Sequence, residues 1–219
     1  MRFKAFFFDF DGVLADSEEV KTQAFSELFR QYGPDVMTRV AKHQHGHFGM
    51  NRYDNLRYYY SNFLGLELSQ EQLDAECARF SALVVDAVSA AAEIPGARDF
   101  LERYTPRVPA WVISNVPQDE VRHIAARRGI APFFQDIHGA PASKEENAGK
   151  LLDRLGLSPE NVLFFGDSLS DLKAARTTGT KFLGILPGPD APLLQKAPDI
   201  TWVLNFRELL DAPSILEGV

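Results

Sequence analysis

The stretch that decides the fold is Phe6-Phe7-Phe8-Asp9-Phe10-Asp11-Gly12-Val13-Leu14. Its first residues continue an apolar, aromatic run that begins at Phe3, and such a short run is typical of a buried β-strand. The strand is expected to end at Phe8, where two carboxylates and a glycine introduce a turn. An acidic turn directly after a buried strand makes Asp9 and Asp11 candidates for chemistry at the edge of a sheet.

The next segment, residues 16–92, has helical periodicity and contains no convincing strand. A predicted capping box begins at Asp16, and apolar residues then recur at helical spacing until Gly33-Pro34 ends the pattern. A second predicted capping box begins at Ser69 and precedes another apolar stripe. The segment therefore reads as an all-helical insert.

Strands and helices alternate in the remainder of the chain. The predicted strands are residues 109–113, 134–138, 162–165, 181–185 and 200–203. Because these strands are apolar throughout, they indicate a parallel sheet that helices cover on both faces. The expected fold is a doubly wound α/β core, made of residues 1–15 and 93–219, with an inserted all-helical cap of residues 16–92.

Polar side chains mark the ends of four predicted strands, which lie along one edge of a parallel sheet. They are Asp9 and Asp11, Ser114 and Asn115, Lys144, and Asp167 and Asp171. Carboxylates brought this close repel one another, and a hard divalent cation such as magnesium removes that conflict. Gly12 leaves the backbone free to turn its N–H groups toward an anion, and a lysine and a hydroxyl can bind phosphate oxygens.

Each of these residues also has a structural explanation. An Asp-x-Asp-Gly sequence occurs in ordinary turns, and it does not fit an EF-hand here because Gly12 comes too early and Val20 replaces the bidentate glutamate. Asp167-Ser168 could cap the helix that follows, and Asp171 could lie on that helix's solvated face. The occurrence of all of them at successive strand ends, in this order, favours a functional site.

Together the four motifs resemble those of the haloacid dehalogenase superfamily, in its phosphatase and phosphoglucomutase-like branch. The motifs are Phe8-Asp9-Phe10-Asp11-Gly12-Val13-Leu14, Val112-Ile113-Ser114-Asn115, Lys144, and Phe165-Gly166-Asp167-Ser168-Leu169-Ser170-Asp171. They occur in the family's order and span most of the chain. The resemblance implies a Rossmann-like core, and the helical insert is similar to the cap that this superfamily places after the first motif.

The resemblance also implies roles for the motif residues. Asp9 would be the nucleophile, and Asp11 would protonate the leaving alcohol and then activate water. Magnesium would be held by Asp9, Asp167 and the main-chain carbonyl of Asp11, with Asp171 in direct contact with the ion or one layer behind it. Gly12 belongs to the phosphate-binding turn.

The remaining two motifs would bind phosphate. Ser114 and the N–H of Asn115 would contact phosphate oxygens, and Lys144 would hold Asp9 and the phosphate together. Lys150 is a rival for the lysine role, but Lys144 is preferred because it lies just after the predicted third strand. Its distance from Leu155-Gly156 also fits the family.

The predicted activity is magnesium-dependent hydrolysis of a small phosphate monoester through an aspartyl phosphate. An acid at Asp11, two residues after the nucleophile, favours phosphate esters over the other substrates of the superfamily. A phosphomutase acting on sugar phosphates would use the same residues and is the first alternative. A non-catalytic sensor or binding module on the same fold is the second, and the complete residue set argues against it.

The cap is expected to select the substrate. Its most unusual stretch, His43-Gln-His-Gly-His-Phe-Gly-Met-Asn-Arg52, is predicted to be a glycine-hinged loop in which His47 or Arg52 contacts the substrate. Alternating histidines can bind metal, but a solvated loop is the commoner explanation. Arg52 could instead form a surface ion pair with Asp54 or Glu67.

Composition narrows the remaining possibilities. The 219 residues carry a formal net charge of −7, so neither nucleic acid nor an anionic membrane is an expected partner. There is no apolar run long enough to cross a bilayer and no targeting segment at the start. The single cysteine, Cys77, forms no disulfide within the chain, which fits the cytoplasm. The expected partner is a small phosphorylated metabolite, bound by a monomer.

Overall fold

The structure is a computed structural model that describes residues 2–46 and 50–219. The chain divides into two compact units. The core unit contains the chain up to Asp16 together with Ala92–Val219, and the cap unit is Ser17–Ala91. The chain leaves the core unit at Asp16 and returns to it at Ala92. These two residues are bonded to each other, because Asp16 N–H donates to the carbonyl of Ala92 at 2.9 Å. The sequence predicts this division one residue away at each point, at residues 15/16 and 92/93.

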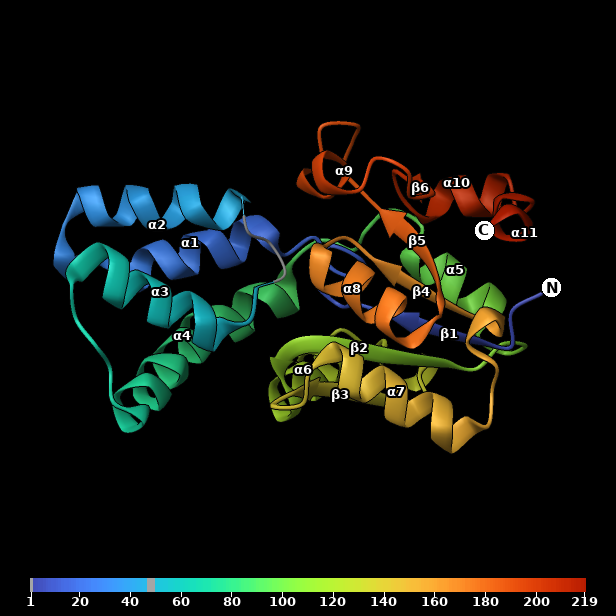
Figure 1. Ribbon diagram of the computed structural model, residues 1–219, viewed down its shortest axis with the longest axis horizontal. Helices are drawn as coiled ribbons and strands as arrows, with labels where there is room; N and C mark the ends of the chain where they lie inside the picture. The colour runs from blue at the N-terminus through green and yellow to red at the C-terminus, as the bar shows by residue number, and fades with distance from the viewer. Residues whose placement is uncertain (1, 47–49) are drawn as a thin grey trace. The chain divides into compact units, whose positions relative to one another are not determined.

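A sheet of six parallel strands forms the centre of the core unit (Figure 1). The strands are β1 (Ala5–Phe8), β2 (Ala110–Pro117), β3 (Asp136–Ala140), β4 (Val162–Gly166), β5 (Lys181–Ile185) and β6 (Trp202–Val203). Their order is β3-β2-β1-β4-β5-β6, so the chain changes direction across the sheet between β1 and β4. In doubly wound folds, ligands bind outside the carboxyl ends of the strands at this change of direction.

Helices cover both faces of this sheet. They are α5 (Ala97–Tyr104), α6 (Gln118–Arg127), α7 (Lys144–Leu155), α8 (Leu169–Thr178), α9 (Pro192–Lys196), α10 (Phe206–Asp211) and α11 (Ile215–Gly218), with single turns η2 (Ala131–Phe133) and η3 (Pro159–Asn161). The predicted doubly wound α/β fold is therefore confirmed. No helix in the described ranges has the length and apolar character to span a membrane.

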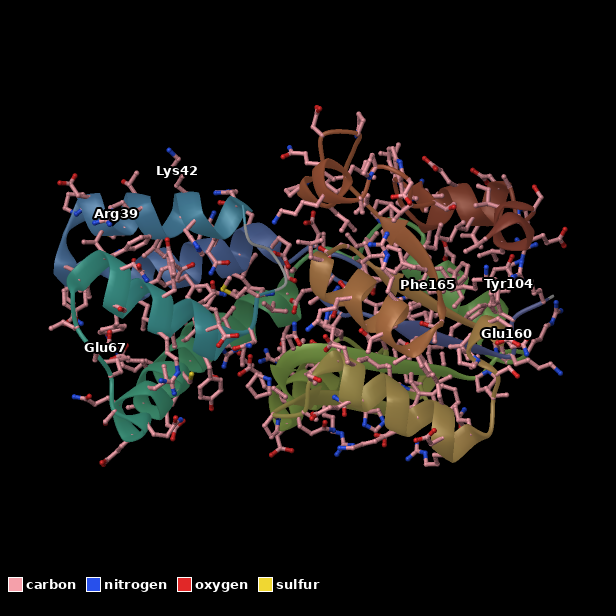
Figure 2. The ribbon with its side chains drawn as sticks, viewed as in Figure 1. Arg39, Lys42, Glu67, Tyr104, Glu160 and Phe165 are labelled. Atoms are coloured by element: carbon pink, nitrogen blue, oxygen red, sulfur yellow. The ribbon has the colours of Figure 1, made fainter. Side chains whose placement is uncertain are left out.

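The alternation of side chains along β1 explains why both faces are buried. Phe6 and Phe8 point to one face, where Phe8 stacks on Phe165 with ring centroids 4.7 Å apart, and Phe100 of α5 and Phe206 of α10 complete the aromatic layer. Figure 2 labels Phe165, together with Tyr104 at the end of α5. Ala5 and Phe7 point to the other face, where they join a cluster that includes residues of α7 and α8.

The cap unit consists of helices. They are α1 (Glu18–Leu28), the single turn η1 (Arg30–Tyr32), α2 (Pro34–Gly46), α3 (Arg52–Leu64) and α4 (Gln70–Ala90). Aromatic packing holds them together: Phe25 of α1 stacks on Phe80 of α4 at 3.9 Å, and Tyr59 of α3 is fully buried. The predicted capping box at Ser69 is confirmed, since Ser69 and Gln72 exchange both hydrogen bonds.

Two details of the predicted cap were wrong. The first helix has Ser17, not Asp16, at its N-cap, because α1 begins at Glu18. The stretch from His43 to Arg52 is not one loop: residues up to Gly46 complete α2, and Arg52 is the first residue of α3. Packing overrides the loop-like composition here, since the His43 ring stacks on Tyr58 at 4.2 Å.

Candidate active site

Asp9 stands at the carboxyl end of the central strand. Its N–H donates to the carbonyl of Phe165 at 2.9 Å, so the end of β1 is bonded to the end of β4. Its Oδ1 accepts a 2.7 Å hydrogen bond from the N–H of Phe10, which fixes the orientation of the carboxylate. Asp9 is 4% exposed, so its carboxylate is buried at the end of the strand.

Lys144 is the first residue of α7, the helix that follows β3 in the chain. Ser143 caps this helix and exchanges both capping-box hydrogen bonds with Glu146. The Nζ of Lys144 lies 2.8 Å from Asp9 Oδ2 and 2.6 Å from Asp171 Oδ1. A cation at a helix N-terminus opposes the helix dipole, and these two carboxylates offset that cost. The structure thus places Lys144 against Asp9, whereas the rival Lys150 is exposed.

Asp171 is fully buried and uses both of its oxygens within the protein. Oδ1 accepts the bond from Lys144, and Oδ2 accepts hydrogen bonds from the N–H of Ser168 at 3.1 Å and from its hydroxyl at 2.6 Å. These three bonds hold Lys144 and the start of α8 in place.

Asp9, Asp167 and Asp171 each offer a carboxylate oxygen, and the three oxygens lie within 4.8 Å of one another. Carboxylate donors of this kind, two buried and one half-buried, suit a hard divalent cation better than they suit zinc or copper. Gly12 lies beside this group with a φ of +72°, and a β-carbon there would overlap the carboxylate of Asp167. The three carboxylate oxygens fit a magnesium ion, and the absence of a side chain at Gly12 leaves room for the carboxylate of Asp167 among them.

The electrostatics of the site distinguish the nucleophile candidate from its lysine. The pKa of Asp9 is raised to about 7: burial is the largest cause, the charge of Asp171 adds to it, and the charge of Lys144 opposes it. Burial lowers the pKa of Lys144, but the carboxylates of Asp171 and Asp9 outweigh it and raise that pKa above its usual value. Lys144 therefore stays charged, and Asp9 is the partner whose charge depends on its surroundings. A cation beside Asp9 would favour its carboxylate form.

Ser114 and Asn115 belong to β2 itself, because this strand continues to Pro117 instead of ending at the predicted residue 113. Ser114 is 1% exposed, and its Oγ accepts a 3.1 Å hydrogen bond from the N–H of Val116. That bond uses a lone pair and leaves the hydroxyl proton to act as a donor. The side-chain amide of Asn115 donates to Ser170 Oγ at 3.3 Å.

Asp11 lies in a tight turn that follows β1. The turn closes on itself, since Gly12 N–H donates to the carbonyl of Ala15 at 2.8 Å. Asp11 is 5% exposed, and its charge acts to raise the pKa of Arg128. Burial lowers the pKa of Arg128, while the carboxylates of Glu93 and Asp11 oppose that effect.

His47 and Arg52 are the two cap residues that the sequence predicts to contact the substrate. His47 lies outside the described residues. Arg52 is buried within the cap unit, where its Nη1 donates to Ser81 Oγ at 2.6 Å and its guanidinium lies 4.5 Å from the centre of the Phe80 ring. These contacts support a structural role for Arg52, and contact between Arg52 and substrate stays a prediction.

The sequence suggests Ser168 only as a possible helix cap, and it gives no indication of a role for Ser170. Ser168 bonds Asp171, and Ser170 lies 3.0 Å from Ser168 and accepts the bond from Asn115. A chain of hydrogen bonds thus runs from β2 through α8 to the lysine. The Ser-x-x-Asp spacing of Ser168 and Asp171 is a capping-box pattern and could have indicated the first of these contacts.

Comparisons with known proteins agree with this arrangement. The family model of haloacid dehalogenase-like hydrolases matches residues 3–179. A phosphoglycolate phosphatase from Pasteurella multocida is 34% identical over 107 residues, a match that spans 45% of this chain and 47% of that protein. Phosphoglycolate phosphatase 1 from Pseudomonas aeruginosa is 26% identical over 214 residues, or 93% of this chain and 77% of that protein.

A solved structure shows the same likeness along nearly the whole chain. It is a haloacid dehalogenase-like family hydrolase, SP0104, from Streptococcus pneumoniae. The TM-score is 0.71 at 26% identity, and the match covers 92% of this chain and 94% of that one.

Proposed function

This chain belongs to the haloacid dehalogenase-like hydrolase family and is a phosphatase of that family, and we propose that it hydrolyses a small phosphate monoester through an aspartyl phosphate on Asp9. The observation that carries the proposal is the position of Lys144 Nζ, within 2.8 Å of both Asp9 and Asp171. An ammonium group held against a buried carboxylate can neutralise a phosphate that approaches the same carboxylate.

The reaction proceeds in two displacements. In the first, a carboxylate oxygen of Asp9 attacks phosphorus, the ester P–O bond breaks, and Asp11 gives a proton to the leaving alcohol oxygen. In the second, Asp11 takes a proton from water as that water attacks the phosphorus of the aspartyl phosphate. The P–O bond to Asp9 then breaks, and inorganic phosphate leaves.

The phosphate is bound by residues of β2 and by the first residue of α7. Ser114 Oγ and the N–H of Asn115 donate to the non-bridging oxygens, and Lys144 balances their charge. Gly12 keeps the turn after β1 close to Asp167, where a side chain would obstruct the site. Because these donors are fixed before substrate arrives, little reorganisation is needed as charge develops in the transition state.

Asp9, Asp167 and the main-chain carbonyl of Asp11 would hold a magnesium ion, with Asp171 supporting the group through Lys144 and Ser168. Bound there, magnesium supplies positive charge that screens the carboxylates from the phosphate and polarises a phosphoryl oxygen.

The substrate is proposed as a small phosphorylated metabolite. Two relatives are named phosphoglycolate phosphatases, so 2-phosphoglycolate is the first compound to test. The proposed location is the cytoplasm. A chain whose single cysteine, Cys77, is free has no internal disulfide, as is usual for proteins of that compartment. We also propose that the enzyme acts as a monomer.

The test is a phosphorus NMR time course with magnesium, run on 2-phosphoglycolate and on sugar 1-phosphates. Release of inorganic phosphate that accounts for nearly all substrate consumed is expected, and Asp9→Asn should abolish it. Accumulation of a sugar 6-phosphate would identify a phosphomutase with the same residues. Failure of the wild-type protein to consume any phosphate ester would leave the sensor or binding module as the explanation.

A further inference from the structure

The end of β2 departs from its neighbour β3 just where the proposed phosphate contacts lie. The ladder between the two strands is regular up to Ile113 and resumes at Pro117. Three residues of β2, numbers 114–116, therefore stand opposite one residue of β3, Gly139. A bulge of this kind bends its strand and redirects its side chains. This bulge carries Ser114 and Asn115.

Gly139 allows the two backbones to approach closely at the bulge. A β-carbon on Gly139 would overlap the carbonyl oxygen of Val116 and would lie 2.8 Å from both N and Cα of Gln118. A side chain at this position would therefore push the end of β2 away from β3. The absence of a β-carbon at residue 139 fits a backbone approach that the bulge requires.

The side chain of Gln118 joins the two strands across this point. Its Nε2 donates to the carbonyl of Ile137 at 2.5 Å, and its Oε1 accepts from the N–H of Gly139 at 2.6 Å. One amide thus bonds two backbone groups of β3 that flank His138. Because Gln118 is also the first residue of α6, these bonds fix where the bulge ends and the helix begins.

The bulge is held at its other side as well. Asn115 donates to Ser170 of α8, and Val116 N–H donates to Ser114 Oγ. The Ser170 bond is long, at 3.3 Å, while both Gln118 bonds are short. Gln118 therefore holds the end of the bulge through two bonds that are both shorter than the one between Asn115 and Ser170.

We propose that Gln118 is a positioning residue, which holds the bulge of residues 114–116 in the shape that presents Ser114 Oγ and Asn115 N–H to phosphate. The inference rests on the proposed phosphatase function and extends it to a residue outside the four motifs. Hydrogen bonds weaken steeply with distance and angle, so a small displacement of these two donors lowers the affinity for phosphate.

The experiment compares Gln118→Met with Arg122→Met. Methionine keeps the length of glutamine and removes both amide bonds. Arg122 is a matched control, since its Nε donates to the same carbonyl of Ile137 at 3.1 Å from one turn further along α6. With p-nitrophenyl phosphate and magnesium, Gln118→Met should raise KM at least fivefold and leave kcat within twofold. The inhibition constant of inorganic phosphate should rise by the same factor, and Arg122→Met should change neither by more than twofold.

A second measurement needs no activity. Amide hydrogen exchange at residues 114–116 should be at least tenfold faster in Gln118→Met than in wild type and unchanged in Arg122→Met. Gln118→Glu, which can still accept from Gly139 N–H, should fall between wild type and Gln118→Met and serves if methionine prevents folding. Wild-type KM together with wild-type exchange in both Gln118 variants would overturn the inference. A wild-type protein with no phosphatase activity would refute the proposed function, while the exchange rates would still decide whether Gln118 holds the bulge.

Discussion

Gly12 lies directly against the carboxylate of Asp167, which a β-carbon on Gly12 would overlap. The turn after β1 can therefore approach the end of β4 only because residue 12 has no side chain. Gly12 also has a φ of +72°, a region that other residues adopt at a cost. The two constraints act on the same residue. They predict the first of the variants below.

Gly12→Ala should reduce phosphatase activity strongly and weaken the response to magnesium, because Asp167 must move. It should also lower the free energy of unfolding by about 1 kcal/mol or more through backbone strain. Magnesium titrations of the rate and thermal melts measure the two effects. Gly149→Ala in α7 is the control, since a β-carbon there meets nothing within 4 Å. It should leave the magnesium response unchanged and raise the free energy of unfolding by about 0.5–1 kcal/mol, because alanine is the better helix former. Normal magnesium dependence in Gly12→Ala would contradict the predicted role of Asp167.

The raised pKa of Asp9 predicts how stability depends on pH in metal-free buffer. The ordinary pKa is 3.8 and the folded value is about 7, so between these values the folded protein binds more protons than the unfolded chain. The free energy of unfolding should therefore fall as pH rises from about 4 to about 7, by a few kcal/mol at most. The raised pKa of Lys144 does not act in this window, because its effect begins above pH 10.

Asp9→Asn tests that prediction directly. The variant has no carboxyl group to ionise at residue 9, so its stability should lose this part of the pH dependence and should equal or exceed that of wild type near pH 7. Urea denaturation at several pH values, in the presence of a chelator, measures the difference. Parallel curves for the two proteins would show that Asp9 ionises normally.

Lys144→Met should destabilise the protein by roughly 3–5 kcal/mol, because Asp9 and Asp171 would remain buried without their shared cation. Turnover should be lost as well. Lys150→Met removes a lysine from the exposed side of the same helix and should change stability by about 0.5 kcal/mol or less. Equal losses in the two variants would mean that the buried ion pairs contribute little.

Chelation should stop turnover, and added magnesium should restore it. Zinc should restore it poorly, since the carboxylates of Asp9, Asp167 and Asp171 are hard donors with no sulfur ligand among them. The measurement is the rate with p-nitrophenyl phosphate after dialysis against a chelator. Full activity in excess chelator would refute the magnesium-dependent mechanism.

Arg52→Ala should lower the melting temperature, because it removes both the bond to Ser81 and the contact with the Phe80 ring. Arg52→Lys should recover part of the loss through its charge. Relative rates on a panel of phosphate esters form the second measurement. A changed substrate ranking with an unchanged melting temperature would favour the predicted substrate contact instead.

The sequence predicted the layered core well, because strand and helix periods in the second half of the chain agree with burial. Its motifs also named the four residues that the structure brings together, Asp9, Lys144, Asp167 and Asp171. The limits lie where contacts are distant in sequence. The bulge at Ser114 depends on Gln118 reaching β3, and the helical end of α2 depends on His43 packing against Tyr58, neither of which a local pattern reveals.

The place of β1 in the sheet has a consequence for biosynthesis. This fully apolar strand leaves the ribosome before both of its partners, β2 and β4, whose pairing residues begin at Ala110 and Val162. Synthesis at 5–20 residues per second leaves one side of β1 without its partner for roughly 10–30 s. The intervening cap sequence, whose contacts are local, has time to fold during that delay. Nascent chains that stall before Val162 would expose an aromatic strand and would be prone to aggregate or to engage chaperones.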